Sequence, residues 1–238
     1  MNHLLCVSGG VGSRMTIGNV PKQYLTVKGK PVIAYTLERF DSHRDIDAIW
    51  IVADEKWHDF IEEWMIKCGI RKFRGFAKPG DSRQESVRNG LIAMRECAAD
   101  RDIVIVHDAV RPRTSDEIIT ECVSGFDAYD GVMPSLPVTD TCYLSFDGKT
   151  IGRQLPRDQI VAGQTPESYF FGKYYEAHMK ASSEYLAGCR GSSQIAFENG
   201  MKIRIAPGSR DNFKITTKED FVRFAKICGG VEETVKFD

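Results

Sequence analysis

The sequence predicts an α/β fold with a mainly parallel sheet. Short runs that are almost entirely apolar, such as residues 47–54 (DAIWIVAD), alternate with longer segments whose apolar residues recur at helical spacing. This alternation is typical of parallel sheets, whose strands are buried on both faces by the connecting helices. With 238 residues, the chain is expected to form one domain, residues 1–238, with a protruding arm.

The predicted elements follow one another along the chain. The strands are residues 3–8 (HLLCVS), 47–54, 71–77 (RKFRGFA), 102–109 (DIVIVHDA) and 202–208 (KIRIAPG). The helices are residues 31–40, 57–69, 82–94, 115–126, 192–200 and 217–228. Asp81 or Ser82 is expected to cap the third helix, and Thr216 or Thr217 the last, because short oxygen-bearing side chains accept hydrogen bonds from the first-turn N–H groups.

The pattern changes after Gly131, where β-rich segments without a long amphipathic helix begin. Residues 142–162 are expected to form a β-arm, and the FDGK stretch within it is typical of a hairpin turn. The arm has too little apolar material for its own core. A second copy of the chain is therefore expected to order it, which predicts a homodimer.

Composition excludes several classes of protein. The net charge is −1, with 42% hydrophobic and 27% charged residues, so no overall charge favours nucleic acid or a membrane surface. The seven cysteines form no Cys-x-x-Cys pair, which argues against zinc and disulfides and fits a reducing cytoplasm. No signal peptide and no membrane-spanning stretch are expected.

A glycine-rich loop follows the first predicted strand. Residues 8–14 (SGGVGSR) include Ser8, Gly9, Gly10 and Gly12, whose backbone N–H groups can approach an anion closely. Arg14 and Lys22 add positive charge, which favours a phosphate-rich ligand. The loop matches neither the Walker A motif nor the dinucleotide fingerprint. A tight turn without a functional role is the alternative.

Three further segments follow or precede predicted elements at the same edge of the sheet, where ligands bind in open α/β folds. In GDSRQES, Gly80 can approach a base or ribose and Ser86 can donate a hydrogen bond; the alternative is an ordinary helix start capped by Asp81. In HDAVRP, Asp108 can hold Mg²⁺, or else serve as a cap or ion pair, and His107 is expected to be buried and hydrogen-bonded. In DNFKITT, Asp211 and Lys214 are expected to reach the same edge of the sheet; the alternative is that both are solvated surface residues.

Together these motifs carry a family resemblance that covers nearly the whole chain. SGGVGSRM…PKQYL, GDSRQES, HDAVRP, PVTDT, LPRDQIVAGQTPESY and DNFKITTKED occur in an order and spacing similar to the cytidylyltransferases that make CDP-methylerythritol and CDP-ribitol. The resemblance implies a Rossmann-like, glycosyltransferase-A-like nucleotidyltransferase domain. It also implies CTP and a polyol phosphate as substrates, Mg²⁺ as cofactor, and a homodimer joined by the β-arm.

The resemblance assigns roles to individual positions. The expected catalytic cations are Arg14, Lys22 and Lys214. The expected nucleotide-binding residues are Ser8, Gly9, Gly10, Gly12, Gly80, Asp81, Ser86 and Ala109. The expected acceptor-binding residues are Arg111, Asp140, Thr141, Arg157 and Thr165, with Arg157 and Thr165 gripping the acceptor phosphate from the neighbouring subunit. Asp108 and, secondarily, Asp211 are the expected Mg²⁺ ligands.

The choice of acceptor depends on departures between the branches of the family. Thr139, Gln164 and the PRDQ run are more similar to the ribitol-phosphate branch, which favours D-ribitol 5-phosphate over 2-C-methyl-D-erythritol 4-phosphate. Residues 192–194 (SSQ) replace a Thr-Asp pair, so another alditol phosphate such as glycerol phosphate stays open. A glycosyltransferase, a non-catalytic nucleotide-binding module and an NAD-dependent oxidoreductase are the other classes. They lack support because Asp-x-Asp and the third fingerprint glycine are missing, and because a pure binding module has no use for the clustered cations.

Overall fold

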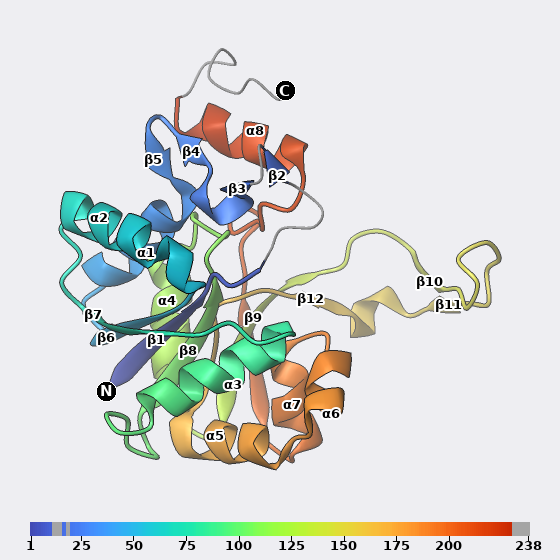
Figure 1. Cartoon of the computed structure of the whole chain (residues 1–238). Helices are drawn as coiled ribbons and strands as arrows, with labels where there is room; N and C mark the ends of the chain where they lie inside the picture. The colour runs from blue at the N-terminus through green and yellow to red at the C-terminus, as the bar shows by residue number, and fades with distance from the viewer. Residues whose placement is uncertain (11–15, 18–19, 230–238) are drawn as a thin grey trace.

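The computed structural model describes residues 1–10, 16–17 and 20–229, which are built around one central sheet (Figure 1). Its eight strands are β1 (Asn2–Val7), β6 (Ala48–Val52), β7 (Phe73–Ala77), β8 (Ile103–Asp108), β9 (Gly131–Pro137), β12 (Val161–Gly163), β13 (Glu167–Phe170) and β14 (Ile203–Pro207). Their order is β12-β9-β13-β8-β1-β6-β7, and β14 also pairs with β9. Pairs β1–β6, β1–β8, β6–β7 and β9–β14 are parallel, whereas β12 and β13 run antiparallel to their neighbours. The predicted mainly parallel α/β sheet is confirmed.

Helices cover both faces of the sheet (Figure 1). They are α1 (Val32–Ser42), α2 (His58–Cys68), α3 (Arg83–Met94), α4 (Asp116–Ser124), α5 (Phe171–Lys180), α6 (Ser183–Gly188), α7 (Ser192–Glu198) and α8 (Lys218–Ile227). Leu4 and Cys6 of β1 pack with α1, α2 and α4, whereas Leu5 packs with α3, α5 and α7. Successive strand residues point to opposite faces, so two covered faces explain the unbroken apolar run of β1. None of the helices that the structure describes is long and apolar enough to cross a membrane.

The structure decides between the helix caps that the sequence left open. Ser82 caps α3, because its side chain accepts from the N–H of Glu85. Thr217 caps α8 in a reciprocal capping box with Asp220. Helix α2 ends at Gly69, whose φ of 66° lies in the left-handed region that glycine adopts without strain.

Strand β13 and helices α5 and α6 were not predicted from the sequence. Strand β13 passes into α5 at Phe170, the N-cap residue of α5, whose side chain makes no capping hydrogen bond. The usual signal of a polar cap between a strand and a helix is therefore missing here. Phe171 and Tyr174 of α5 are fully buried, so tertiary packing replaces the local signal.

A hairpin of β10 (Cys142–Leu144) and β11 (Arg153–Leu155) projects from the body of the domain (Figure 1). The carboxylate of Asp147 accepts hydrogen bonds from the N–H groups of Lys149 and Thr150 and so closes the loop between the strands. The 3₁₀-helix η3 (Arg157–Gln159) follows, and β12 then pairs with β9. Val161 and Ala162, which the sequence analysis placed in the arm, therefore belong to the main sheet.

Candidate active site

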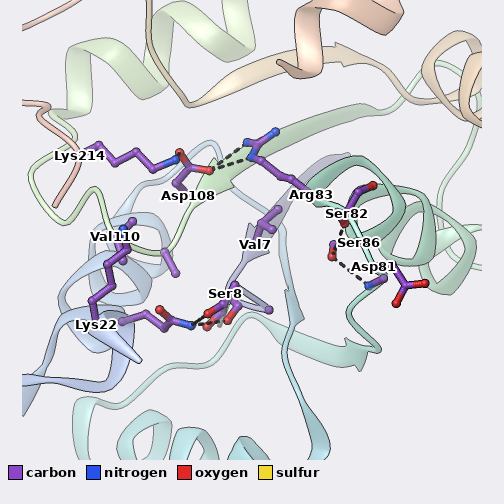
Figure 2. Close-up of a pocket in the computed structure, with 15 residues that line it drawn as sticks. Val7, Ser8, Lys22, Asp81, Ser82, Arg83, Ser86, Asp108, Val110 and Lys214 are labelled. Atoms are coloured by element: carbon purple, nitrogen blue, oxygen red, sulfur yellow. Dashed lines mark hydrogen bonds and ion pairs between the residues drawn. The ribbon is translucent and has the colours of Figure 1, made fainter. Parts of the chain in front are cut away.

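A pocket of about 530 Å³ lies where β1 and β8 end. Val7 and Asp108, the last residues of these parallel strands, are paired in register. The pocket therefore opens at the carboxyl edge of the sheet, where open α/β folds bind their ligands. Figure 2 shows its lining, which comprises Val7, Ser8, Gly9, Gly10, Lys22, Gln23, Gly80, Asp81, Ser82, Arg83, Ser86, Asp108, Ala109, Val110 and Lys214.

The first wall of the pocket is the segment that continues β1. The N–H of Ser8 donates to the carbonyl of Val52 at 2.9 Å, so this residue still follows the sheet. Lys22 opens the short 3₁₀-helix η1 (Lys22–Tyr24) and is 9% exposed. Gly12 and Arg14, which were predicted to belong to this wall, lie outside the described residues.

The second wall is the loop that leads into α3. The hydroxyl of Ser86 accepts from the N–H of Gly80 at 3.0 Å and donates to the carbonyl of Ser82 at 3.0 Å. The N–H of Asp81 donates to the carboxylate of Glu85 at 3.0 Å. Ser86 was expected to donate to the nucleotide, but here its hydroxyl is used to shape the loop.

The two walls approach each other closely. A Cβ atom built on Gly9 would lie 2.6 Å from Cβ of Pro79 in the opposite wall, whereas one built on Gly80 would lie 2.3 Å from Cβ of Glu85 in its own wall. Both positions therefore require glycine for steric reasons. This close approach narrows the pocket between the loops, where the sequence analysis expected cytosine and ribose.

Asp108 gathers three cations at the floor of the pocket. One of its oxygens, Oδ1, accepts from Nε and Nη2 of Arg83 at 3.1 and 2.9 Å, and the other, Oδ2, lies 2.8 Å from Nζ of Lys214. Nε of Arg111 is 3.8 Å from Oδ2. Burial alone would raise the pKa of Asp108, but the charges of Arg83, Lys214 and Arg111 hold that pKa well below its usual value. The carboxylate is therefore ionised at neutral pH.

Arg83 and Glu167 are two charged residues at this floor that the sequence analysis did not name. Nη1 of Arg83 donates to the hydroxyl of Ser192 at 2.6 Å, which ties α3 to the start of α7. Glu167 is 6% exposed and accepts from the hydroxyl of Tyr169 at 2.7 Å. Burial raises the pKa of Glu167, and the charge of Arg83 opposes that shift. One sequence feature could have identified Arg83: it directly follows the cap residue of a helix that begins after a strand-end loop.

The residues that follow β8 hold each other in place. His107 is fully buried, and its Nε2 lies 3.2 Å from the carbonyl oxygen of Arg111. Burial lowers the pKa of His107 to about 3, so the ring is neutral at physiological pH and has a structural role, as expected. Nη1 of Arg111 donates to the carbonyl of Asn212 at 2.6 Å, which places Arg111 beside the segment that carries Lys214.

Thr165 lies in the body of its own subunit. Its hydroxyl accepts from the N–H of Asp108 at 3.3 Å, and the residue is only 6% exposed. It was expected to act with Arg157 on the site of a neighbouring subunit. The structure instead places it under the pocket of its own chain.

Three further residues that were expected to bind the acceptor lie at the arm: Asp140, Thr141 and Arg157. Nη1 of Arg157 donates to the carbonyl of Thr139 at 2.9 Å, and a hollow of about 410 Å³ beside it is lined in part by Thr141 and Asp158. Asp140 directly precedes this hollow, and its carbonyl accepts from Sγ of Cys142 at 3.7 Å. The chain does not bring Asp140, Thr141 and Arg157 into the lining of its own pocket.

Whether Asp108 and Asp211 can hold Mg²⁺ depends on the lone pairs that their carboxylate oxygens keep available. Within the described residues, no three or more His, Cys, Asp and Glu side chains are grouped to hold a metal ion. Oδ2 of Asp108 accepts one hydrogen bond, from Lys214, so it keeps a lone pair for a cation. Asp211 is 63% exposed, lies within 4.0 Å of Arg113 and Arg223, and is not part of the lining. Asp108 therefore offers one carboxylate oxygen for Mg²⁺ beside substrate phosphates, and the position of Asp211 outside the lining gives no support for it as a second ligand.

Comparisons with known proteins agree with this fold. Residues 2–228 match the family model IspD, 2-C-methyl-D-erythritol 4-phosphate cytidylyltransferase. A ribitol-5-phosphate cytidylyltransferase of Vibrio parahaemolyticus is 31% identical over 237 residues, which cover 100% of both chains. A 2-C-methyl-D-erythritol 4-phosphate cytidylyltransferase of Rubrobacter xylanophilus is 33% identical, with 96% of this chain and 95% of that protein covered.

Solved structures share the fold. The crystal structure of 4-diphosphocytidyl-2C-methyl-D-erythritol synthase from Anaerococcus prevotii superposes with a TM-score of 0.78 at 23% identity, covering 95% of each chain. The 2-C-methyl-D-erythritol 4-phosphate cytidylyltransferase of Thermus thermophilus gives a TM-score of 0.72 at 24% identity, covering 96% of this chain and all of that one. Together with the match to the family model over nearly the whole length, these findings identify a nucleotidyltransferase. The chain belongs to the IspD family of cytidylyltransferases.

Proposed function

We propose that this protein joins CTP to D-ribitol 5-phosphate and releases pyrophosphate. The observation that carries the proposal is the pocket at the ends of β1 and β8, where Lys22, Arg83 and Lys214 surround a space between two glycine-containing loops. The ribitol-5-phosphate cytidylyltransferases of Vibrio parahaemolyticus and Lacticaseibacillus paracasei, which are similar over at least 92% of this chain, support the choice of acceptor.

The reaction needs cations rather than a covalent intermediate. An oxygen of the acceptor phosphate attacks the α-phosphorus of CTP, the bond from that phosphorus to the bridging oxygen breaks, and pyrophosphate leaves with the electron pair. Two anions must meet, and negative charge grows on the phosphorus and the leaving group. Lys22 and Lys214 reach the pocket from different segments (Figure 2), so they can neutralise this charge from two directions.

The acceptor is the part of the proposal on which relatives differ. 2-C-Methyl-D-erythritol 4-phosphate is the second candidate, because the Rubrobacter xylanophilus relative with that name is 33% identical. Thr139 and Gln164 favour ribitol 5-phosphate by resemblance. In the structure, the side chain of Gln164 exchanges hydrogen bonds with the backbone of Ser209 at 2.9 and 3.1 Å, and so fixes the loop that precedes Asp211.

A pyrophosphate-release assay tests the acceptor. With CTP, we expect the highest kcat/KM for D-ribitol 5-phosphate among a panel that also contains 2-C-methyl-D-erythritol 4-phosphate and glycerol 3-phosphate. Each candidate is measured at the same enzyme and Mg²⁺ concentration. A higher kcat/KM for the methylerythritol substrate would replace ribitol by the second candidate.

The narrow space beside the contact of Gly9 with Pro79 leads to a prediction about the nucleotide. CTP is expected to be used well, and ATP and GTP poorly, because Gly9 packs against Pro79 and so brings the two loops close together where the base is expected. The measurement is kcat/KM for each nucleotide with the preferred acceptor. Equal turnover of all four nucleotides would contradict the assignment of this space to the base.

A second prediction concerns the metal. When bound, Mg²⁺ would neutralise phosphate charge, and Asp108 is its proposed ligand. Chelation of divalent ions should abolish turnover, and Asp108→Asn should raise the Mg²⁺ concentration needed for half-maximal rate. The maximal rate should also fall, because Arg83 and Lys214 lose their shared partner.

The comparison for this prediction is Asp211→Asn, which removes a carboxylate outside the pocket lining. Its Mg²⁺ requirement should stay near that of the wild type. A shifted requirement in Asp211→Asn but not in Asp108→Asn would move the metal role to Asp211, and full activity in excess chelator would remove the metal altogether.

The arm completes the proposal as a dimer contact. Tyr143, Phe146 and Ile151 on the hairpin are 51%, 86% and 69% exposed, and within the described part of the chain β10 and β11 pair only with each other. An isolated two-stranded hairpin is marginally stable in water, so packing against a second subunit would bury these side chains. In such a dimer, Arg157 would serve the acceptor pocket of the partner subunit.

A further inference from the structure

The side chain of Gln23 is buried against the loop that follows β1. Its Nε2 donates to the carbonyl of Ser8 at 2.7 Å and to the carbonyl of Gly10 at 2.8 Å. The residue is 4% exposed and directly follows Lys22 in η1. Both neighbours of Nε2 are carbonyl oxygens, which only accept, so the amide must present its NH₂ group to them.

A second contact from η1 supports the same loop. The hydroxyl of Tyr24 lies 2.9 Å from the hydroxyl of Ser8. The ring of Tyr24 is stacked on Trp57 with centroids 4.2 Å apart, so its position is fixed by packing. The loop is therefore held on its carbonyl side by two adjacent residues of one short helix.

The geometry of the peptide group gives this arrangement a consequence for ligands. The C=O and N–H of one planar trans peptide point in opposite directions. Because Gln23 binds the carbonyl of Ser8, the N–H of Gly9 in the same peptide is directed away from Gln23. Among the described residues, no protein atom accepts a hydrogen bond from the N–H of Gly9 or Gly10.

Carbonyl oxygens at this place would oppose a triphosphate. Ser8, Gly10 and Gln23 all line the pocket, and a carbonyl oxygen carries partial negative charge. Without the two hydrogens of the Gln23 amide, the carbonyls of Ser8 and Gly10 would be free to turn toward an anionic ligand. The amide holds them in one orientation and neutralises their dipoles, so the loop offers N–H groups instead.

We propose that Gln23 is a positioning residue for the nucleotide: it fixes the carbonyls of Ser8 and Gly10 so that the loop accepts the negative charge of the triphosphate. The inference rests on the proposed use of CTP. It predicts that the contribution of Gln23 to binding grows with the charge of the ligand.

The test compares Gln23→Met with Gln23→Glu. Methionine keeps the length of the side chain, removes both donors and adds no charge. We expect the Kd of CTP to rise by about five- to tenfold in Gln23→Met, as two hydrogen bonds are lost, and to rise further in Gln23→Glu. The Kd of cytidine, which has no phosphate, should rise by a clearly smaller factor. In turnover, KM for CTP should rise while kcat changes little, because the ground state and the transition state lose the same contacts.

The matched control is Gln159→Met, an exposed glutamine on the arm, which should bind CTP like the wild type. Isothermal titration without acceptor gives the Kd values, and Tm shows whether each variant is folded. If Gln23→Met binds CTP like the wild type, or loses cytidine and CTP by the same factor, the inference is wrong, even where Gln23→Glu binds poorly through charge repulsion alone.

Measuring all four nucleoside triphosphates with their nucleosides separates this inference from the proposed function. The preferred base tests the proposed function. The ratio between triphosphate and nucleoside, taken for whichever base binds best, tests the role of Gln23.

Discussion

Lys22→Ala is expected to lower kcat by about 100-fold or more, since the loss of one donor aimed at transition-state charge costs about 3–4 kcal/mol. Lys22 lines the pocket and is only 9% exposed, so the packing of the surrounding chain restricts where its side chain can reach. The Kd of CTP should change less than kcat, because the charge that Lys22 neutralises grows as pyrophosphate departs. Single-turnover kinetics with saturating CTP and acceptor measure the chemical step directly.

Two further variants serve as comparisons for Lys22→Ala. Lys56→Ala removes an exposed lysine that is not part of the lining, and should keep wild-type kcat. Lys214→Ala should lower kcat as Lys22→Ala does and should also release Oδ2 of Asp108 from its ion pair. A near-native kcat with a raised KM in Lys22→Ala would show that Lys22 binds substrate without acting on the transition state.

Mixing two inactive variants is expected to restore activity. Arg157→Ala should raise KM for the polyol phosphate and leave KM for CTP nearly unchanged, because Arg157 lies at the arm and outside the lining of its own pocket. In a heterodimer of Arg157→Ala and Lys22→Ala subunits, one site combines an intact Lys22 with an intact arm from its partner, and the other site carries both defects. That heterodimer should regain about half of native activity, as one of its two symmetry-related sites is complete.

The experiment needs heterodimers purified through two different affinity tags, assayed at an acceptor concentration well below the raised KM. The two homodimers, treated in the same way, are the controls and should stay inactive. Without recovery in verified heterodimers, Arg157 would serve its own subunit or the arm would not cross to the partner.

Much of the fold could be predicted because its signals are local. The apolar runs of β1, β6 and β8, the glycine after α2 and the threonine before α8 each report on a few neighbouring residues. The junction of β13 and α5 lacks such a signal, since Phe170 is followed directly by helix. There the aromatic side chains that favour a strand are held in a helix by burial.

The residues of the site likewise divide into those that local sequence signals predict and those that they do not. That Ser8, Gly80, Asp108 and Lys214 line one pocket could be expected, because each lies beside the end of a strand or the start of a helix at the same edge of the sheet. The partners of Asp108 could not be predicted. Arg83 reaches Asp108 from helix α3, and in the sequence Arg83 is one arginine among many. The hydroxyl of Ser86 was assigned to the ligand, whereas its partners are backbone groups of its own loop, which depend on the turn that Gly80 allows.

The two glycines Gly9 and Gly80 of the pocket also limit how this protein can be redesigned. A binding site is usually enlarged by trimming a side chain, but Gly9 and Gly80 have none to remove. Gly9 already packs against Pro79 of the opposite wall, and Gly80 packs against Glu85 and Ser86 of its own wall. Point substitutions at these two positions are therefore not expected to give a variant that accepts purine nucleotides. It requires an added residue that lengthens the loop before α3, so selection for such a variant should begin from libraries of insertions between Pro79 and Ser82.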